Sequence, residues 1–409
     1  MSKILVFSIP PINKDSNNTF ELLFKNINKK HKLYFLSCRD GTNNSDTFKE
    51  IYTLSENKAI KSIFKRKIDI FAKTNPYQVS DELKIYKKNN HFHNIKRIIR
   101  DCLWALSNWK KSSLKTFLTD ESFDYIVAPS EGYHYYLRVL KYICNVSKAK
   151  LILYTWDDNF TFKQGQLSPL FFFYRIKTRH LLKNISKKYL FKTISISNKT
   201  KAEADQFFKS DSVLVKKTIP FCKFKKLNNK EIKIIYAGNL LNGREKSLLK
   251  IAQAIQDESF NNIRLNIFTD NIGKKTQKKL AKLKNVYIHN AISHDELIKE
   301  ENNSDIGLML ESLSFGKKKI SRLSISTKFT DYIGSNLPIF AIMDDKSATA
   351  EEIQNNCLGY VVSNKSQIEN MLKTMINAFL MNKFKESISN YKNKYTSEKQ
   401  DLIINQLFL

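Results

Sequence analysis

The sequence predicts an α/β fold made of two parallel-sheet domains. Short apolar runs of strand length alternate with segments of helical periodicity, and this alternation starts a second time after residue 230. The chain has 409 residues, of which 42% are hydrophobic, so it is long enough for two cores. We expect the first domain over residues 1–217 and the second over residues 218–395.

Composition limits the class of protein. No run of about 18 apolar residues occurs, and Pro10 and Pro11 soon interrupt the apolar start, so we expect neither a membrane-spanning helix nor a signal peptide. The 5 cysteines have no paired spacing and the 7 histidines form no metal-ligand pattern, which argues against a disulfide framework and a zinc site. A reducing cytoplasm is the expected location, and we expect no metal ion or other cofactor.

The charge is strongly positive and unevenly distributed. Residues 1–220 carry 40 basic and 19 acidic side chains, a net charge of +21, whereas residues 221–409 carry 29 and 20, a net charge of +9. Only 10 of the 69 basic residues are Arg, so part of the excess fits the amino-acid bias of an AT-rich genome. The asymmetry nevertheless suggests that the N-terminal half faces an anionic membrane surface, a pyrophosphate-linked acceptor or nucleic acid.

The first domain opens with a strand, a helix and a second strand, and it lacks a dinucleotide-binding glycine fingerprint, which counts against an NAD enzyme. Strands are expected at residues 3–9, 32–37, 123–129, 149–154, 193–197 and 212–216. Asp157 and Asp158 follow the fourth of these strands, where open parallel sheets build their sites. A carboxylate there can orient a substrate hydroxyl or help to remove its proton, or it can cap the following helix.

Two basic segments with interleaved aromatic residues interrupt this pattern. One carries Trp104 and Trp109, and the other places aromatic residues 171–174 directly before a basic helix. Such a segment suits either the lipid headgroup region or ordinary packing of an amphipathic helix. Nucleic acid also selects basic and aromatic side chains, but no recognition module follows, so we expect no nucleic-acid partner.

The second domain offers two places suited to a nucleoside diphosphate. After a strand at residues 232–237, the loop with Gly238 and Asn239 lets the backbone approach a ligand, and Arg244 and Lys246 lie at the next helix start, where two cations suit a diphosphate. The later segment has its own helix start. Ser326 or Thr327 can cap it, and free N–H groups, the helix dipole and Lys328 would meet a phosphate. Asp331 stands at i+4 from Thr327, so it shares that face and can accept ribose hydroxyls.

The order Ser-Thr-Lys-Phe-Thr-Asp-Tyr-Ile-Gly-Ser-Asn-Leu-Pro-Ile at residues 326–339 resembles the donor-site segment of GT-B-type glycosyltransferases. It is closest in pattern to the family 4-like enzymes of bacterial surface polysaccharide synthesis, whose phosphate-binding entry the segment at residues 232–246 also resembles. The resemblance implies a GT-B architecture, with two Rossmann-like domains facing across a cleft and a C-terminal helix at residues 396–409 returning to the first domain.

The chain departs from the family at one position. Many members carry two Glu residues separated by seven, whereas here Leu323 stands eight places before Asp331 and Asp replaces the second Glu. The sugar contact of the first Glu would then pass to Glu311 or to the loop at residues 312–321.

The resemblance implies transfer of a sugar from a nucleotide-sugar donor to a lipid-linked or oligosaccharide acceptor in surface polysaccharide or capsule synthesis, with retention and without a metal. In this interpretation Asp157 or Asp158 faces the acceptor, and Arg244 or Lys246 stabilises the leaving diphosphate. The residues expected to hold the donor are Gly238, Asn239, Glu311, Ser326, Thr327, Lys328 and Asp331. The protein would be cytoplasmic and peripheral on the inner face of the plasma membrane. Two alternatives remain open: a sugar-nucleotide epimerase, and a non-catalytic GT-B-like module that binds a membrane or a partner.

Overall fold

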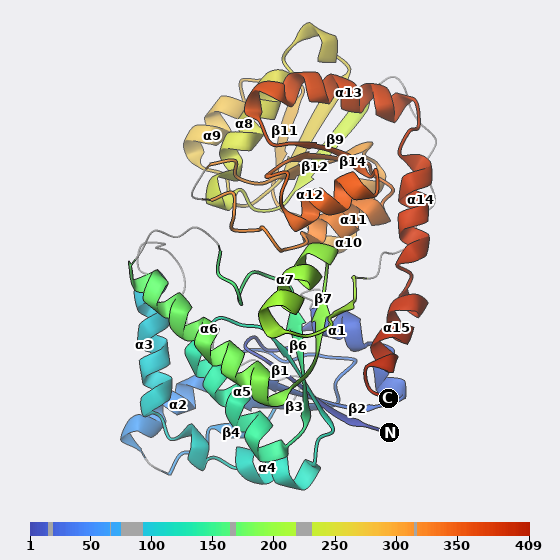
Figure 1. The fold of residues 1–409 in the computed structure, drawn as a ribbon. Coiled ribbons are helices and arrows are strands. Elements are labelled where there is room, and N and C mark those ends of the chain that lie inside the picture. The colour runs from blue at the N-terminus through green and yellow to red at the C-terminus, as the bar shows by residue number, and fades with distance from the viewer. Residues whose placement is uncertain (15–18, 66, 75–92, 164–168, 218–230, 315–316) are drawn as a thin grey trace.

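Two α/β domains, each with its own sheet, are joined into one elongated molecule (Figure 1). The structure is a computed structural model, and it describes residues 1–14, 19–65, 67–74, 93–163, 169–217, 231–314 and 317–409. The expected domain boundary and its linker fall at residues 218–230, outside the described residues. No helix in the described ranges is both long and apolar enough to cross a bilayer.

The first sheet has the strand order β4-β3-β2-β1-β5-β6-β7-β8. Its strands are β1 (Lys3–Ser8), β2 (Lys32–Ser37), β3 (Glu50–Leu54), β4 (Phe71–Lys73), β5 (Tyr125–Pro129), β6 (Lys150–Thr155), β7 (Leu190–Ser195) and β8 (Val213–Leu214). The central strands are continuous apolar runs because helices cover both faces of the sheet. Edge strand β4 pairs antiparallel with β3. This sheet is therefore mixed, whereas a parallel sheet was expected from the sequence.

The helices of the first domain pack on the two faces of this sheet. They are α1 (Thr19–Phe24), α2 (Glu56–Phe64), α3 (His93–Leu106), α4 (Leu114–Glu121), α5 (His134–Ser147), α6 (Pro169–Tyr189) and α7 (Asn198–Phe208). Trp104 on α3 is only 2% exposed and the nearby Trp109 only 5%, and both belong to the core. Of the two possibilities left open for these tryptophans, the structure supports ordinary packing.

The second sheet is parallel throughout, with the order β11-β10-β9-β12-β13-β14. Its strands are β9 (Ile232–Ala237), β10 (Ile263–Phe268), β11 (Val286–His289), β12 (Ile306–Leu310), β13 (Ile339–Ile342) and β14 (Gly359–Val362). Its helices are α8 (Arg244–Ala254), α9 (Lys274–Leu280), α10 (His294–Asn302), α11 (Thr327–Gly334), α12 (Ala348–Asn355), α13 (Ile368–Leu380) and α14 (Lys385–Lys394). The strand order reverses between β9 and β12, so the loops that follow these two strands diverge and leave a crevice at their carboxyl ends.

The chain returns to the first domain at its end. Helix α15 (Ser397–Gln406) follows α14 down the side of the molecule, so that the two termini lie close together (Figure 1). Asn26 Nδ2 donates to Asp401 Oδ2 at 2.7 Å, and Ile404 and Phe408 belong to the core on one face of the first sheet.

Candidate active site

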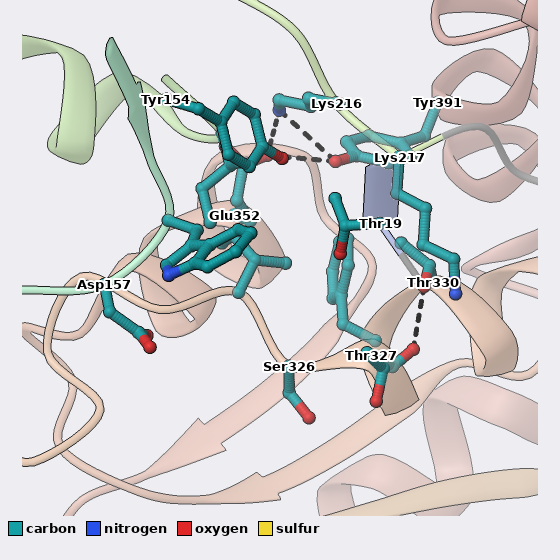
Figure 2. A pocket seen from close by; sticks show the side chains of 14 residues that line it. Thr19, Tyr154, Asp157, Lys216, Lys217, Ser326, Thr327, Thr330, Glu352 and Tyr391 are labelled. Carbon is teal, nitrogen blue, oxygen red and sulfur yellow. Dashed lines mark hydrogen bonds and ion pairs between the residues drawn. The ribbon is translucent and has the colours of Figure 1, made fainter. Parts of the chain in front are cut away.

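Two cavities lie between the domains, each of about 300 Å³. The first, which we call the Arg244 cavity, is lined by Asp157, Arg244, Met309, Glu311, Ile320, Ser321, Ser324, Ser326, Met343, Ser347 and Thr349. The second, the Trp156 cavity, is lined by Thr19, Tyr154, Trp156, Asp157, Ile196, Lys216, Lys217, Ile325, Ser326, Thr327, Phe329, Thr330, Glu352 and Tyr391 (Figure 2). Asp157 and Ser326 line both cavities, one from each domain. They therefore mark the place where the two cavities meet.

Arg244 stands at the start of α8, at the crevice of the second sheet. Its guanidinium forms a fork with Glu311 at the end of β12: Nη2 lies 2.7 Å from Oε1, and Nε lies 3.2 Å from Oε2. Arg244 Nη1 also donates to Asn239 Oδ1 at 2.7 Å. The structure thus brings together three of the residues expected from the sequence, and a planar fork of N–H donors at a cavity wall suits a phosphate as well as a carboxylate.

Lys328 lies against Gly238 beside this arginine. Gly238 has φ 136°, a conformation that favours glycine, and a Cβ there would stand 2.9 Å from both Cε and Nζ of Lys328, so the end of the lysine would have to move. Burial lowers the pKa of Lys328, and the positive charge of Arg244 lowers it further. Two cations held together away from water favour an anion between them.

Helix α11 begins at the junction of the cavities. Ser326, not Thr327, occupies the N-cap position, and its side chain makes no capping hydrogen bond. The helix is anchored from below by Phe329, Tyr332 and Ile333, which belong to the core of the second domain. Because the first turn has N–H groups that lack helical partners, its start adds partial positive charge at Ser326.

Asp157 comes from the loop after β6 and faces the second domain. Its carboxylate accepts a hydrogen bond from Ser324 Oγ. Burial raises the pKa of Asp157, and the negative charge of Asp158 raises it further. Glu131, in the loop after the neighbouring strand β5, has a pKa raised to about 7 by burial and then by the charge of Asp157. The edge of the first sheet at the cleft therefore holds a group of carboxyl groups with reduced acidity.

Asp158, which was also expected to face the acceptor, is buried in a turn. Its side chain is fully buried, and its oxygens accept from the backbone N–H of Phe162 at 3.1 Å and of Lys163 at 2.9 Å. It lines neither cavity described above. Its contacts stabilise this turn, whereas the alternative considered from the sequence was a cap of the following helix.

Two further residues expected at the site lie outside the linings of both cavities. Lys246 is exposed on α8 and lines neither the Arg244 cavity nor the Trp156 cavity. Asp331 Oδ1 lies 3.4 Å from Lys217 Nζ and lines neither cavity, whereas Thr327 lines the Trp156 cavity.

Residues 234–399 match the family described as glucosyltransferase 3-like, C-terminal domain. The second half of the chain is a glycosyltransferase domain. Together with the fold, this match confirms the resemblance to GT-B-type glycosyltransferases expected from the sequence. A comparison with curated protein sequences gave no match.

Solved structures similar to the whole chain share the fold of this glycosyltransferase domain and of the domain before it. WaaG, a glycosyltransferase involved in lipopolysaccharide biosynthesis, has a TM-score of 0.56 and 11% identity over 98% of this chain and 99% of its own. A mutant of S. aureus TarM, in complex with fondaparinux, alpha-GlcNAc-glycerol and UDP, has a TM-score of 0.61 and 11% identity over 100% of both chains. UDP-GlcNAc 2-epimerase from Neisseria meningitidis, bound to UDP-GlcNAc, has a TM-score of 0.53 and 12% identity over 100% of this chain and 99% of its own. At these identities the likeness establishes the GT-B fold alone.

The structure also shows what Leu323 does in place of the first Glu of the resembling enzymes. Leu323, which stands where the resembling enzymes carry their first Glu, is fully buried and belongs to the core of the first domain. It faces away from the Arg244 cavity, whereas Glu311 lines that cavity. Of the two replacements considered from the sequence, Glu311 is the acidic residue that the structure places there.

Sequence reasoning did not single out the far wall of the Trp156 cavity. There Lys216 Nζ lies 2.6 Å from Glu352 Oε2, and Tyr391 Oη donates to the same oxygen at 3.1 Å (Figure 2). Burial lowers the pKa of Lys216 in spite of this partner. These residues come from the segment after β8, from α12 and from α14, so no local pattern marks them. The described part of the chain contains no group of three or more His, Cys, Asp or Glu side chains placed to hold a metal ion.

One buried carboxyl group behind α11 makes the stability of the domain depend on pH. Glu301 is 2% exposed, and burial, followed by the negative charge of Asp331, raises its pKa from 4.5 to about 8. The folded state therefore holds a proton that the unfolded state releases above pH 4.5, and its contribution to stability is lost as the pH rises toward 8.

We expect Glu301→Gln to be more stable than the wild type at pH 9, by on the order of 3 kcal/mol, and nearly equal to it at pH 4.5. Glutamine keeps the size of the side chain and an acceptor for Ser335 Oγ, which lies 3.3 Å from Glu301 Oε2. Urea unfolding of both proteins at the two pH values measures the difference. A constant difference at both pH values would contradict the assignment of the buried proton.

Proposed function

We propose that the protein transfers a sugar from a nucleotide-sugar donor to a lipid-linked or oligosaccharide acceptor in bacterial surface glycan synthesis. The observation that carries the proposal is the convergence of Arg244 and the start of α11 at a cavity that Asp157 reaches from the other domain, with Lys328 beside Gly238 and within reach of the charge of Arg244. Arg244, Lys328 and the helix start supply positive charge for a departing diphosphate, and Asp157 supplies a carboxylate for an acceptor hydroxyl.

In the proposed reaction the donor diphosphate occupies the Arg244 cavity and displaces the carboxylate of Glu311 from the guanidinium. The bond between the anomeric carbon and the diphosphate oxygen breaks as the acceptor oxygen bonds to that carbon. Arg244 and Lys328 stabilise the charge that develops on the diphosphate, and they do so without a metal ion. We also propose retention at the anomeric carbon, which the resemblance supports; the acceptor proton then leaves on the departing diphosphate.

The Trp156 cavity is proposed to receive the acceptor saccharide. Trp156 and Tyr154 come from the end of β6, and aromatic faces suit the apolar face of a sugar ring. Asp157 joins this cavity to the Arg244 cavity, so an acceptor hydroxyl hydrogen-bonded to Asp157 would lie at the boundary with the donor. The shared wall supports a direct transfer between the two substrates.

A screen of nucleotide sugars for release of free nucleoside diphosphate, with and without saccharide acceptors and with EDTA present, tests this proposal. We expect one donor to give diphosphate, faster when acceptor is added and unaffected by EDTA. Interconversion of UDP-GlcNAc and its 2-epimer without an acceptor would instead establish the epimerase, whose fold is shared. Absence of turnover and of nucleotide binding would support a non-catalytic module.

We further propose that the first domain docks on an anionic membrane through the neighbouring helices α3 and α6. Exposed apolar side chains gather at the beginnings of the two helices: Ile95 and Ile99 on α3, and Leu170, Phe172, Phe173 and Ile176 on α6. The helices are held together there, since Tyr174 Oη donates to Asp101 Oδ2 at 2.6 Å. Helix α6 carries Arg175, Lys177, Arg179, Lys183, Lys187 and Lys188 and no acidic residue. Aromatic side chains beside uncompensated cations suit an anionic lipid headgroup layer.

Exchange of two of these aromatic residues is expected to weaken membrane binding. Phe172→Ser/Phe173→Ser should lower the fraction bound to phosphatidylglycerol vesicles about tenfold or more, because each ring loses the free energy of burial in the bilayer. Leu402→Ser removes a similarly exposed apolar side chain from α15 and should bind like the wild type. Equal binding of all three proteins, or equal binding to neutral phosphatidylcholine vesicles, would contradict the proposed surface.

A further inference from the structure

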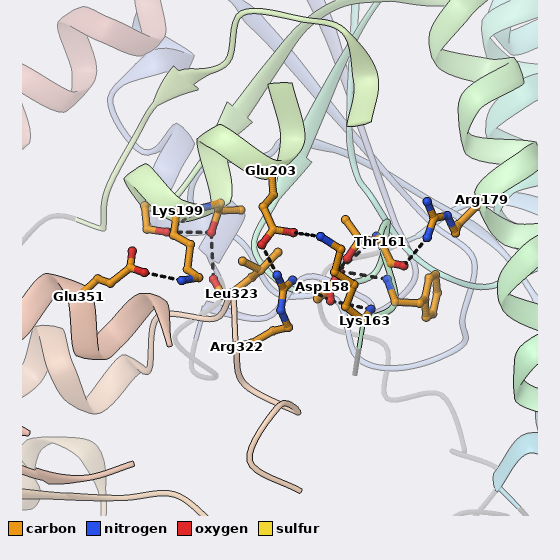
Figure 3. A network of polar contacts seen from close by, with 12 residues as sticks. Asp158, Thr161, Lys163, Arg179, Lys199, Glu203, Arg322, Leu323 and Glu351 are labelled. Carbon is orange, nitrogen blue, oxygen red and sulfur yellow. Dashed lines mark hydrogen bonds and ion pairs between the residues drawn. The ribbon is translucent and has the colours of Figure 1, made fainter. Parts of the chain in front are cut away.

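A short segment of the second domain, beside the Arg244 cavity, contacts the first domain. We call this segment the strap. Its residues Arg322, Leu323 and Ser324 each contact the first domain by a different kind of interaction, and Figure 3 shows Arg322 and Leu323. The strap lies immediately before Ser326 and α11, and Ser324 itself lines the Arg244 cavity. A change in the strap therefore reaches the candidate active site directly.

The first contact is ionic. Arg322 Nη1 lies 2.9 Å from Asp158 Oδ2, and Nη2 is paired with Glu203 on α7. The three side chains are at most 17% exposed, so the pair of ionic contacts is shielded from solvent. This assigns Asp158 a partner across the domain interface in addition to its turn-capping bonds.

The second contact, made by Leu323, is hydrophobic, and the third is the hydrogen bond that Ser324 Oγ donates to Asp157. Leu323 is 0% exposed and is the one residue of the second domain in the described core cluster of the first domain that also contains Phe160, Ala204 and Phe208. Its carbonyl oxygen accepts from Thr200 Oγ1 on α7 at 2.9 Å. An apolar side chain inserted in the core of another domain fixes the separation of the two domains more firmly than surface ion pairs do.

The strap is also hydrogen-bonded to its own domain, at the start of α12. Ala348 N, at the start of α12, donates to Arg322 O at 2.9 Å, and Thr349 Oγ1 donates to Ser324 O at 3.0 Å. Next to it, Lys199 of α7 and Glu351 of α12 form a further ion pair between the domains (Figure 3). The strap is thus fixed to α12 in one domain and to α7 in the other.

We propose that the strap is a positioning element for the reaction: Leu323 and Arg322 set the separation of the two domains, and Ser324 holds the carboxylate of Asp157 at the boundary between donor and acceptor. The second part rests on the function proposed above, whereas the first part concerns geometry alone. The Leu at position 323, a departure from the resembling enzymes, then has a role of its own in closing the cleft.

The separation can be measured with the protein's own cysteines. Cys102 on α3 and Cys357 after α12 are exposed, one in each domain, whereas Cys38 and Cys144 are buried. In a Cys222→Ser background, fluorophores on Cys102 and Cys357 report the distance between the domains by single-molecule energy transfer. The matched control is Lys163→Ala, which removes a cation 3.4 Å from the same Glu203 without crossing between the domains.

We expect Arg322→Ala/Leu323→Ala to shift the energy-transfer distribution to longer and broader distances, and Lys163→Ala to leave it unchanged. If the double variant fails to fold by circular dichroism, Arg322→Lys decides, because a lysine keeps the charge but cannot bridge two carboxylates in a fork. An unchanged distribution in a folded double variant, or in Arg322→Lys where the double variant does not fold, would overturn the role of the strap. This readout does not depend on turnover, so it separates failure of the strap from failure of the proposed function.

Ser324→Ala tests the second part. We expect about tenfold slower transfer with an unchanged KM for the donor, and a loss of activity on the acid side that begins at higher pH. The reason is that the Ser324 hydrogen bond lowers the pKa of Asp157, while Asp158 on the same loop and burial raise it; Glu131 in the adjacent loop also carries a carboxyl group. A lower rate at all pH values with no shift of the acid limb would contradict the positioning role.

Discussion

Arg244→Ala is expected to lower the rate of sugar transfer about 10²- to 10³-fold, because it removes a preorganised cation from the site where charge develops on the leaving diphosphate. The affinity for free nucleoside diphosphate should fall as well. Part of that loss comes from Glu311, whose carboxylate loses the partner 2.7 Å away and would repel the diphosphate. Calorimetric titration and initial-rate kinetics measure the two effects separately.

Two further variants show whether the lower rate and affinity result from losing a cation at the position of Arg244 or from losing positive charge in general. Arg244→Ala/Glu311→Gln removes the unpaired carboxylate, so it should recover part of the lost nucleotide affinity but little of the rate. Lys246→Ala removes an exposed cation two residues along α8 and should stay within about twofold of the wild type. Equal losses in Arg244→Ala and Lys246→Ala would mean that general positive charge, not the fork at the cavity, holds the diphosphate.

Asp157→Asn is the second change with a large expected effect. We expect the rate to fall about 10²- to 10⁴-fold while the affinity for nucleoside diphosphate stays the same, because an amide of the same size cannot orient and polarise an acceptor hydroxyl as a charged carboxylate does. The raised pKa of Asp157 places the acid limb of the wild-type pH–rate profile above the range of an ordinary Asp, since the reaction needs the ionised carboxylate.

The control for this variant is Asp211→Asn, which makes the same change at a side chain that is 82% exposed in the first domain. It should leave both rate and affinity unchanged. If Asp157→Asn weakened nucleotide binding as much as it slowed transfer, Asp157 would be part of the donor site, and the division of roles between the two cavities would be wrong.

Much of the fold was predictable because its signals are local. Apolar runs predict six of the eight described strands of the first sheet, all but β3 and β4, and Gly238 and Pro338 mark chain turns at strand ends. The expected donor-binding residues were predictable for the same reason. Arg244, Glu311 and Ser326 each stand just after a strand or at a helix start, and such positions meet at the crevice of a parallel sheet.

The remaining site depends on contacts between distant parts of the chain. Leu323 reads as an ordinary apolar residue, and nothing near it in sequence shows that the core it enters belongs to the other domain. Asp331 pairs with Lys217, 114 positions away, so its helical spacing from Thr327 could not reveal its direction. Trp104 had an apolar and a basic neighbourhood typical of a membrane helix, and only tertiary packing decides that it is buried.

The central claim is that a diphosphate binds where the fork of Arg244, the side chain of Lys328 and the start of α11 meet. A crystal structure of the protein with UDP tests it most directly. We expect phosphate oxygens within hydrogen-bond distance of the Arg244 guanidinium and of the first backbone N–H groups of α11, with Glu311 moved away from the guanidinium. Phosphates bound elsewhere, with the pairing of Arg244 and Glu311 intact, would contradict the account.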